Sequence, residues 1–267
     1  MKSASGIGLS EVTAVYSGPE GDLWELLMGQ QIHVGGFRAS MDLAERAGIR
    51  GGMKGVDLCC CNGAGMRFLV RFRGVSSMIG VDATEKIVTR GRVRCEEEGL
   101  ADRISFILGD ACRTGLPAAS ADFVWGEDAW CYVSDKSALI AEAARIAKPR
   151  GTIAFTDWVE GPNRMADAES ERLLRLMKFP NVLDIDGYAG LLKDNRCEVI
   201  AAEDTSRFAA HIDLYMNMID MQLMYDALKI VGFNMELMQA LAGEFGFMRE
   251  LANQKKLIQA RFIARRA

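Results

Sequence analysis

Histidine and paired cysteines are scarce in this sequence. Only two histidines occur, His33 and His211, and none of the seven cysteines belongs to a Cys-x-x-Cys pair. The three consecutive cysteines, Cys59 to Cys61, would point to alternating faces of a strand, where they are poorly placed to bind one metal ion. The sequence therefore predicts no metal site, and an odd number of thiols favours a reducing compartment such as the cytoplasm.

Long apolar runs and an excess of basic residues are absent too. No run approaches the roughly 20 apolar residues of a membrane-spanning helix, and residues 1–6 have no apolar signal core. With 32 Lys and Arg against 36 Asp and Glu, the net charge is −4, which disfavours general nucleic-acid binding. We therefore expect a cytoplasmic protein whose partner is a small-molecule substrate, with no nucleic acid and no membrane; a homodimer stays open.

The strict dinucleotide fingerprint Gly-x-Gly-x-x-Gly is also missing. In its place stands Lys54-Gly-Val-Asp-Leu-Cys-Cys-Cys-Asn-Gly-Ala-Gly65, followed by a helix-like segment at 66–73. A strand, a tight loop and a helix in this order can turn backbone N–H groups toward a ligand. An ordinary buried strand with a glycine turn is the competing interpretation of this stretch taken alone.

Strand and helix patterns alternate along most of the 267 residues. Such repeated units predict an α/β fold with a doubly wound, mostly parallel seven-stranded sheet. We assign residues 51–205 and 254–267 to this core, 1–50 to an N-terminal helical layer over the binding site, and 206–253 to an inserted, Met-rich helical cap. The seven predicted strands begin near Val56 and include 77–81, 104–108, 122–125, 152–156, 198–202 and 256–263.

The same patterns predict the elements outside the core. Residues 1–20 are rich in Gly and Ser and are expected to be extended. Helical spacing is expected at 22–32, at 41–47 with Ser40 as its cap, and in two long cap helices at 206–231 and 234–253.

Four aspartates lie just after predicted strands. They are Asp82, Asp110, Asp128 and Asp157, and all four are expected along the carboxyl edge of the sheet, where ligands of such folds bind. One such Asp is often a helix cap, but four in succession favour a polar binding edge.

The motif around Asp57 resembles the first motif of class I S-adenosyl-L-methionine (SAM) methyltransferases, usually Val-Leu-Asp-Leu-Gly-Cys-Gly-Thr-Gly. On that match Asp57 is the motif's acid, Cys60 its usual Cys and Gly63 its last Gly, whereas Cys59 and Cys61 stand where the family has Gly. Because Cys carries a Cβ, this departure bears on how closely the backbone can approach the cofactor.

Further stretches resemble the sarcosine/dimethylglycine N-methyltransferase type of this family. They are Tyr16–Trp24 with Gln31–Gly36, Gly80–Lys86, and motifs between Phe123 and Trp158. The resemblance implies a Rossmann-like core, SAM as the cofactor, and methyl transfer to a small amine such as sarcosine or dimethylglycine.

The resemblance also implies roles for individual residues. Asp82 would accept hydrogen bonds from the ribose hydroxyls, Asp110 from the adenine amino group, and Glu127 would lie near the methionine portion. The complete cofactor-binding set is Asp57, Cys59, Gly63, Asp82, Ala83, Asp110, Ala111 and Glu127.

The candidates at the reacting end are fewer. Asp128, Trp130 and His33 are the catalytic candidates, since aromatic faces can stabilise a methyl sulfonium and His33 can orient substrate. An Arg would pair bidentately with a substrate carboxylate, which makes Arg164 the first choice, before Arg38 and Arg207. The substrate-binding set is Tyr16, Trp24, Trp158 and Arg164.

Three alternatives remain open at this point. One is O- or C-methylation of an apolar metabolite, which the Met-rich cap would suit. Another is transfer or cyclisation of the aminocarboxypropyl chain of SAM on the same fold, and the last is SAM binding without catalysis.

Overall fold

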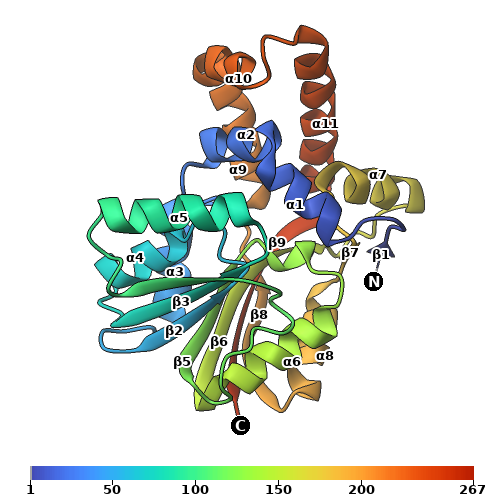
Figure 1. Ribbon diagram of the computed structural model, residues 1–267. Helices are drawn as coiled ribbons and strands as arrows, with labels where there is room; N and C mark the ends of the chain where they lie inside the picture. The colour runs from blue at the N-terminus through green and yellow to red at the C-terminus, as the bar shows by residue number, and fades with distance from the viewer. Residues whose placement is uncertain (1) are drawn as a thin grey trace.

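A twisted seven-stranded sheet forms the centre of the computed structural model, which describes residues 2–267 (Figure 1). The strand order is β4-β3-β2-β5-β6-β9-β8, and only β9 runs antiparallel to its neighbours. This confirms the predicted α/β fold. In chain order the strands are β2 (Lys54–Leu58), β3 (Ser77–Asp82), β4 (Ile104–Leu108), β5 (Ala121–Glu127), β6 (Ala147–Glu160), β8 (Cys197–Asp204) and β9 (Leu257–Arg266).

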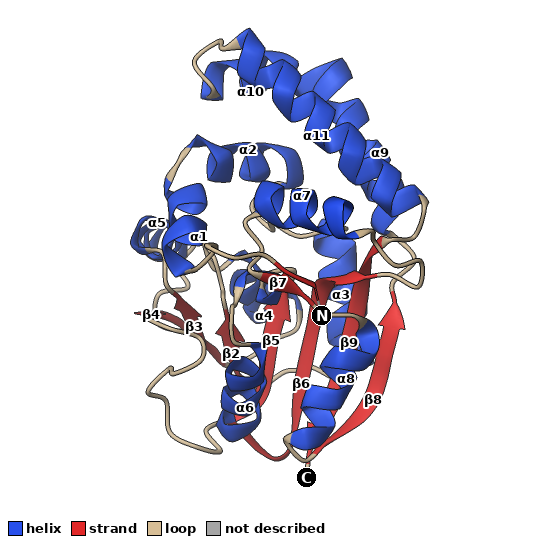
Figure 2. Cartoon of the chain, turned by 90° about the vertical axis from the view of Figure 1, so that its right-hand side faces the viewer, coloured by secondary structure: helices blue, strands red, loops and turns tan. Residues whose placement is uncertain are grey.

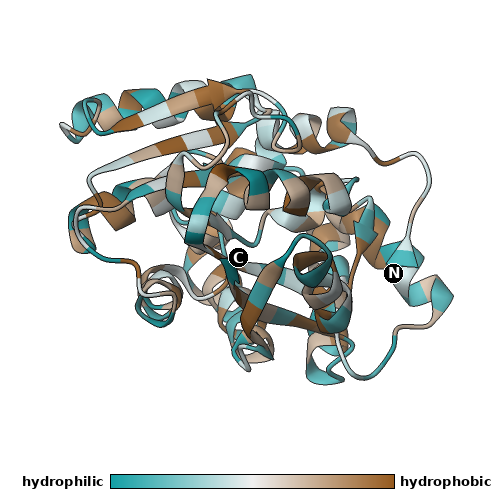
Figure 3. Cartoon of the chain, turned by 90° about the horizontal axis from the view of Figure 1, so that it is seen from below, coloured by the Kyte–Doolittle hydropathy of each residue, from teal (hydrophilic) through white to brown (hydrophobic). Residues whose placement is uncertain are grey.

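Helices cover both faces of the sheet. One face carries α3 (Gly36–Arg46), α4 (Ala64–Phe72) and α5 (Glu85–Glu97), and the other carries α6 (Lys136–Ile146) and α8 (Ile185–Asp194). Figure 3 shows hydrophobic and hydrophilic residues alternating along the helices, the pattern of helices that bury one side. The side chains between the layers are large and fully buried, among them Trp125, Phe155 and Phe262.

A helical layer lies above the carboxyl edge of the sheet (Figure 2). It consists of α1 (Leu9–Ser17), α2 (Pro19–Met28), α7 (Asp167–Met177), α9 (Phe208–Met218), α10 (Met224–Ile230) and α11 (Met235–Asn253). Helices α9 to α11 follow β8 and precede β9, so the chain leaves the sheet for the cap and then returns to its interior. A small sheet of β1 (Lys2–Ser3) and β7 (Asn181–Val182) lies beside α7. In the described part of the chain, no helix combines the length and apolarity needed to cross a membrane.

The N-terminal segment differs from the expectation of an extended chain. Helix α1 forms because Gly8 serves as its N-cap and the Glu11 carboxylate accepts a 2.9 Å hydrogen bond from the Gly8 N–H. Val12 and Val15 are buried on one side of the helix, so two apolar residues one turn apart outweigh the Gly- and Ser-rich composition. Met1 lies outside the described residues.

Other element boundaries also differ from the expectations. Helix α3 begins at Gly36, so Ser40 lies within it and does not cap it. The expected helix at 206–231 is divided by a π-helical turn, Ile219–Leu223, between α9 and α10. Strand β6 continues to Glu160, so Asp157 lies inside this strand, level with Asp128 at the end of β5. It is fully buried and does not line the cavity at the carboxyl ends of β2 to β5.

Candidate functional site

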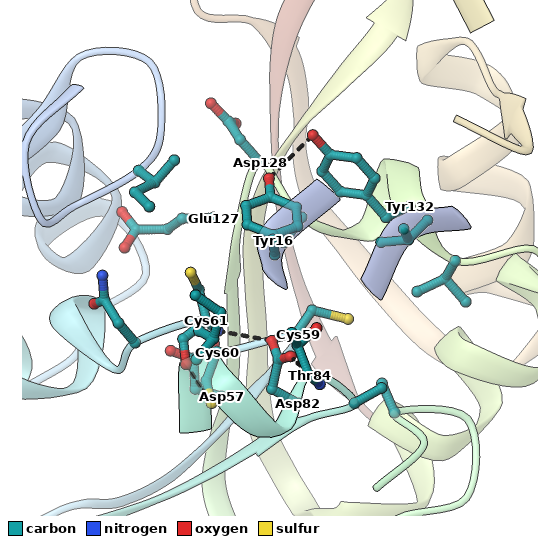
Figure 4. A pocket seen from close by; sticks show the side chains of 18 of the residues that line it. Tyr16, Asp57, Cys59, Cys60, Cys61, Asp82, Thr84, Glu127, Asp128 and Tyr132 are labelled. Atoms are coloured by element: carbon teal, nitrogen blue, oxygen red, sulfur yellow. Dashed lines mark hydrogen bonds between the residues drawn. The ribbon is translucent and has the colours of Figure 1, made fainter. Parts of the chain in front are cut away.

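A cavity of about 430 Å³ opens at the carboxyl ends of β2, β3, β4 and β5 (Figure 4). Its walls come from segments far apart in sequence: the loop after β2, the strand ends with their acids, the 30–33 segment, and one face of α1. A volume of this size is typical of small-molecule and cofactor sites. The short η1 turn (Trp130–Tyr132) after β5 contributes Tyr132 to the wall.

The loop between β2 and α4 bends through left-handed backbone conformations. Cys59 has φ = 62° and Cys61 has φ = 48°, a region that non-glycine residues occupy at a cost of about 1–3 kcal/mol. This geometry lets the Cys61 N–H donate a 2.9 Å hydrogen bond to Asp82 Oδ2. The two positions where the related motif has Gly are therefore positions whose backbone suits Gly, and Cys occupies them under strain.

Position 63 of this motif requires glycine for structural reasons. It is the N-cap of α4 with φ = 73°, and a Cβ there would lie 2.5 Å from Phe106 Cζ. Gly63 itself does not line the cavity, in contrast to the expectation that it contacts the cofactor. Gly65 does line it, and a Cβ on Gly65 would lie 2.9 Å from Glu127 Oε2.

Buried carboxylates surround this loop. Burial raises the pKa of Asp57 well above its usual range, and the nearby carboxylates of Glu127 and Asp82 add to the effect. Burial also raises the pKa of Asp82, opposed by hydrogen bonds from the backbone N–H groups of Thr84 and Cys61. Asp82 already accepts a bond on each oxygen, yet it lines the cavity, and a carboxylate has further lone pairs to offer a ligand.

The end of β4 supplies a more open part of the cavity. Asp110 is exposed and accepts a 2.8 Å hydrogen bond from the Cys112 N–H, while Ala111 is buried beside it. Arg113 is the single Lys or Arg on the cavity wall in the described chain. The position of Arg113, three residues after Asp110, is its one signal in the sequence.

Glu127 belongs to a buried polar network with the loop before α3. Ser40 Oγ donates to Glu127 Oε1 at 2.7 Å and lies 3.0 Å from His33 Nε2. Trp125 Nε1 donates to the other Glu127 oxygen at 3.0 Å. Glu127 and His33 thus lie together at the cavity, joined by Ser40, for which the sequence predicts only a helix cap.

Asp128 holds a different part of the same loop. One of its oxygens accepts from the Val34 N–H at 2.8 Å, and Gln259 Nε2 donates to both oxygens at 2.9 and 2.7 Å. The residue has φ = 51° and lies at the cavity wall. Because protein donors already occupy its carboxylate, Asp128 anchors the loop that carries His33. Nothing in the sequence pattern indicates that Gln259 would bind this carboxylate.

Two tyrosines lie across the cavity near these acids. Tyr16 Oη donates to Tyr132 Oη at 3.0 Å, and the two rings meet edge to face (Figure 4). Burial raises the pKa of Tyr16 well above its usual range, so its hydroxyl stays protonated. The contact joins α1 to the turn after β5 and closes one side of the cavity.

Four other candidates lie away from this cavity. Trp130 is fully buried, donates to the Leu58 carbonyl and stacks on Phe155, because its side chain points into the core. Trp158 packs edge-on against Phe179 and Phe208. The remaining two are Trp24, which lines a separate cavity, and Arg164, which pairs with Glu160 and Asp184.

The charges of the cavity suit a cation. Acidic side chains on its wall greatly outnumber basic ones, and SAM carries a sulfonium and an ammonium against a single carboxylate. The acidic residues are Asp57, Asp82, Asp110, Glu127, Asp128 and Asp135. The donor and acceptor set therefore fits SAM.

A second cavity, of about 370 Å³, lies between α2 and the cap. Its wall is mainly apolar, and α9, the π-helical turn, α10 and α11 contribute most of it. Its methionines are Met177, Met216, Met224, Met235, Met238 and Met248.

The fold is that of class I SAM-dependent methyltransferases. Residues 56–155 match the methyltransferase domain family. Sequence relatives include a 27-O-demethylrifamycin SV methyltransferase of Amycolatopsis mediterranei, 28% identical over 70% of this chain and 74% of that protein. A sterol 24-C-methyltransferase of Gibberella zeae is 31% identical over 50% of this chain, which spans 35% of that protein.

Solved structures share the fold. A Galdieria sulphuraria protein provisionally assigned as a sarcosine dimethylglycine methyltransferase superposes with a TM-score of 0.79 at 22% identity, over 93% of this chain and 98% of that one. The Haemonchus contortus phosphoethanolamine N-methyltransferase 2, solved with SAM, gives a TM-score of 0.83 at 18% identity, over 95% of this chain and 58% of that one. The matched domain at residues 56–155, the sequence relatives and these structures together support a class I SAM-dependent methyltransferase.

Proposed function

We propose that this enzyme transfers the methyl group of SAM to an oxygen or a carbon of an apolar small molecule. The observation that carries the proposal is the second cavity, whose wall of methionine and other apolar side chains has the size of a ligand site. Unbranched thioether side chains adapt to irregular apolar shapes. The relatives named for rifamycin SV and for sterols support an acceptor of this kind.

The cofactor side of the proposal concerns the first cavity. SAM supplies a methyl group activated by its sulfonium. Asp82 would accept from the ribose hydroxyls, Asp110 would accept from the adenine amino group, and the backbone of Ala111 would contact the adenine ring. The other proposed cofactor contacts are Asp57, Cys59, Ala83 and Glu127, all of which line the cavity.

The acceptor side concerns the helical layer. Residues 1–50 and the cap at 206–253 would close over the acceptor and keep water from the reacting atoms. Tyr16 and Tyr132 would limit the reacting end, since their hydrogen bond spans one side of the cavity. Proximity and orientation then account for most of the catalysis that the protein must supply.

A small amine such as sarcosine or dimethylglycine is the second candidate, supported by the acid-rich cavity and by the Galdieria structure. Both compounds carry a carboxylate, which calls for a cation. Arg164 is engaged by Glu160 and Asp184, and Arg207 by Asp42, while Arg38 is exposed and absent from the cavity wall. Apart from Arg113, which lies beside Asp110 after β4, the described part of the cavity wall has no Lys or Arg to bind this carboxylate, and this favours the apolar acceptor.

The test is a turnover screen with SAM. Phenols, sterols, sarcosine and dimethylglycine are supplied separately, and both S-adenosylhomocysteine and methylthioadenosine are followed by mass spectrometry. We expect S-adenosylhomocysteine with members of the apolar group. Turnover with sarcosine or dimethylglycine alone would favour the amine, and methylthioadenosine without acceptor would favour aminocarboxypropyl chemistry.

A matched pair of cap variants tests the second cavity. Met216→Lys places a charge on its wall, whereas Met221 is 87% exposed, does not line the cavity, and serves as the control site as Met221→Lys. We expect Met216→Lys to raise the KM of the apolar acceptor at least about tenfold, the equivalent of about 1.4 kcal/mol, with SAM affinity unchanged. Equal acceptor KM in the two variants would contradict the proposal.

A further inference from the structure

His33 has an unusual hydrogen-bonding position at the first cavity. Its side chain is 4% exposed and lines the cavity wall. Nε2 lies 3.0 Å from Ser40 Oγ and 3.4 Å from Glu127 Oε1. Nδ1 is buried and has no hydrogen-bond partner among residues 2–267.

The Ser40 hydroxyl determines which nitrogen of His33 carries the proton. A hydroxyl has one proton to donate, and Ser40 gives it to the Glu127 carboxylate at 2.7 Å. Ser40 Oγ must therefore accept from its other neighbours, which are Gln31 Nε2 at 3.0 Å and His33 Nε2 at 3.0 Å. Neutral His33 is thus protonated at Nε2, and its Nδ1 presents an unused lone pair.

We propose that His33 Nδ1 is the catalytic base that takes the proton of a hydroxyl acceptor, with Ser40 and Glu127 as positioning residues. The proposal rests on the proposed function, because it names a hydroxyl as the reacting group of the apolar acceptor. Among residues 2–267, His33 is the one histidine on the wall of this cavity, and its buried Nδ1 has no hydrogen-bond partner.

The proton and electron balance is complete without a further reactant. The acceptor O–H bond breaks and its proton moves to Nδ1, while the oxygen electron pair forms the new bond to the methyl carbon. The electron pair of the broken carbon–sulfur bond remains on sulfur, which loses its positive charge. The imidazolium that forms carries that charge, and Glu127 stabilises it through Ser40 and across the 3.4 Å separation.

Neighbouring contacts hold the hydrogen bonds between His33, Ser40 and Glu127 in place. Trp125 Nε1 fixes the second oxygen of Glu127 at 3.0 Å, and Asp128 fixes the Val34 N–H immediately after His33 at 2.8 Å. Ser40 is fully buried within α3. These contacts hinder the ring flip of His33 that would bring Nδ1, in place of Nε2, against Ser40.

The second histidine provides an internal reference for the test. His211 Nδ1 lies 2.9 Å from the Arg207 carbonyl oxygen, which can only accept, so His211 is protonated at Nδ1. In nitrogen-15 histidine spectra of the full chain saturated with S-adenosylhomocysteine, we expect the two rings to show opposite tautomers. His211→Gln assigns the signals, and a proton on Nδ1 of His33, alone or with Nε2, would overturn the proposal.

Two variants test the role in catalysis. We expect His33→Ala to lower kcat for a hydroxyl acceptor by at least about 100-fold, with SAM affinity by calorimetry unchanged and His211→Gln as the active control. Ser40→Ala should mix the His33 tautomers in the spectra and lower kcat more than it raises KM. An unchanged kcat in His33→Ala would overturn the assignment.

The two proposals fail separately. If neither the phenols nor the sterols are methylated, the proposed function fails, while the spectra still decide whether His33 Nδ1 is the free nitrogen. If phenols are methylated by His33→Ala at the wild-type rate, the proposed function stands and the base assignment falls.

Discussion

Gln259 on β9 donates two hydrogen bonds, of 2.9 and 2.7 Å, to the carboxylate of Asp128 at the end of β5. Gln259 is fully buried and also donates to the Val34 carbonyl, while its own side-chain oxygen accepts from Thr205. One amide therefore joins the loop that carries His33 to three other parts of the chain. Such a bond to a buried charge is worth about 1.5–3 kcal/mol.

Replacing this amide tests its contribution to stability. Gln259→Met keeps a similar volume but removes the donors to Asp128, so we expect the free energy of unfolding to fall by about 2–3 kcal/mol, measured by urea denaturation. Gln254→Met on the exposed end of α11 is the control, with an expected change within about 0.5 kcal/mol. Equal stability of the two variants would show that the Gln259 bonds contribute nothing net.

Asp82 offers a test of the cofactor orientation. We expect Asp82→Ala to weaken SAM binding by about 1–3 kcal/mol, because ribose hydroxyls and the Cys61 N–H lose their acceptor. Isothermal titration calorimetry measures the change, and circular dichroism checks the fold. Asp102→Ala, on an exposed turn outside the cavity, is the control and should bind SAM like the wild type. A wild-type affinity in Asp82→Ala, with the fold intact, would contradict the orientation.

The left-handed backbone conformation at Cys61 predicts how variants at this position rank in stability. Gly adopts φ = 48° without strain, whereas a β-branched residue there is a severe outlier. We expect Cys61→Gly to stay within about 1 kcal/mol of the wild type, because relief of strain offsets lost chain entropy and packing. Cys61→Val should lose about 1–3 kcal/mol in thermal or urea unfolding. The ranking fails if Val proves as stable as Gly.

Asp157 gives the stability a pH dependence of known sign. Burial raises its pKa in the folded protein to about 6, from an ordinary value of 3.8, so the folded state holds this proton more tightly than the unfolded state. Its contribution is therefore complete below about pH 4 and is lost as the pH rises through 6.

A variant isolates that contribution. Asp157→Asn keeps an acceptor for the Cys131 N–H and a partner for the Tyr188 hydroxyl but cannot ionise. Relative to wild type, we expect its free energy of unfolding to rise by roughly 2.4 kcal/mol between pH 4 and 7, because each full unit of pKa shift is worth 1.36 kcal/mol. A stability difference that stays constant over this range would place the pKa of Asp157 near its ordinary value.

Periodicity and motif spacing were sufficient for the sheet and for several acids that line the first cavity. The seven strands and the acids Asp57, Asp82 and Asp110 follow from alternation and from positions just after apolar runs. Local signals of this kind do not say where a strand stops. Strand β6 runs on past Asp157 because β9 pairs with it up to Glu160, a partner that lies about a hundred residues further along the chain.

The reacting end was less predictable for a related reason. Side chains such as Trp130 and Trp158 follow strands in sequence, but their rings fill gaps in the core, and sequence spacing carries no information on that choice. Ser40 and Gln259 act through hydrogen bonds that span 87 and 131 residues. Such contacts exist only once the fold has brought the segments together.

The position of β9 has a consequence for how the protein is made. This strand lies between β6 and β8, both of which leave the ribosome before it. Until residues 257–266 emerge, β8 has no neighbour in the sheet, the Asp128 carboxylate lacks its Gln259 donor, and the His33 loop is held on one side only. A nascent chain can thus form its amino-terminal strands early, but the wall of the first cavity at Asp128 and His33 is completed only after residues 206–253 have been synthesised.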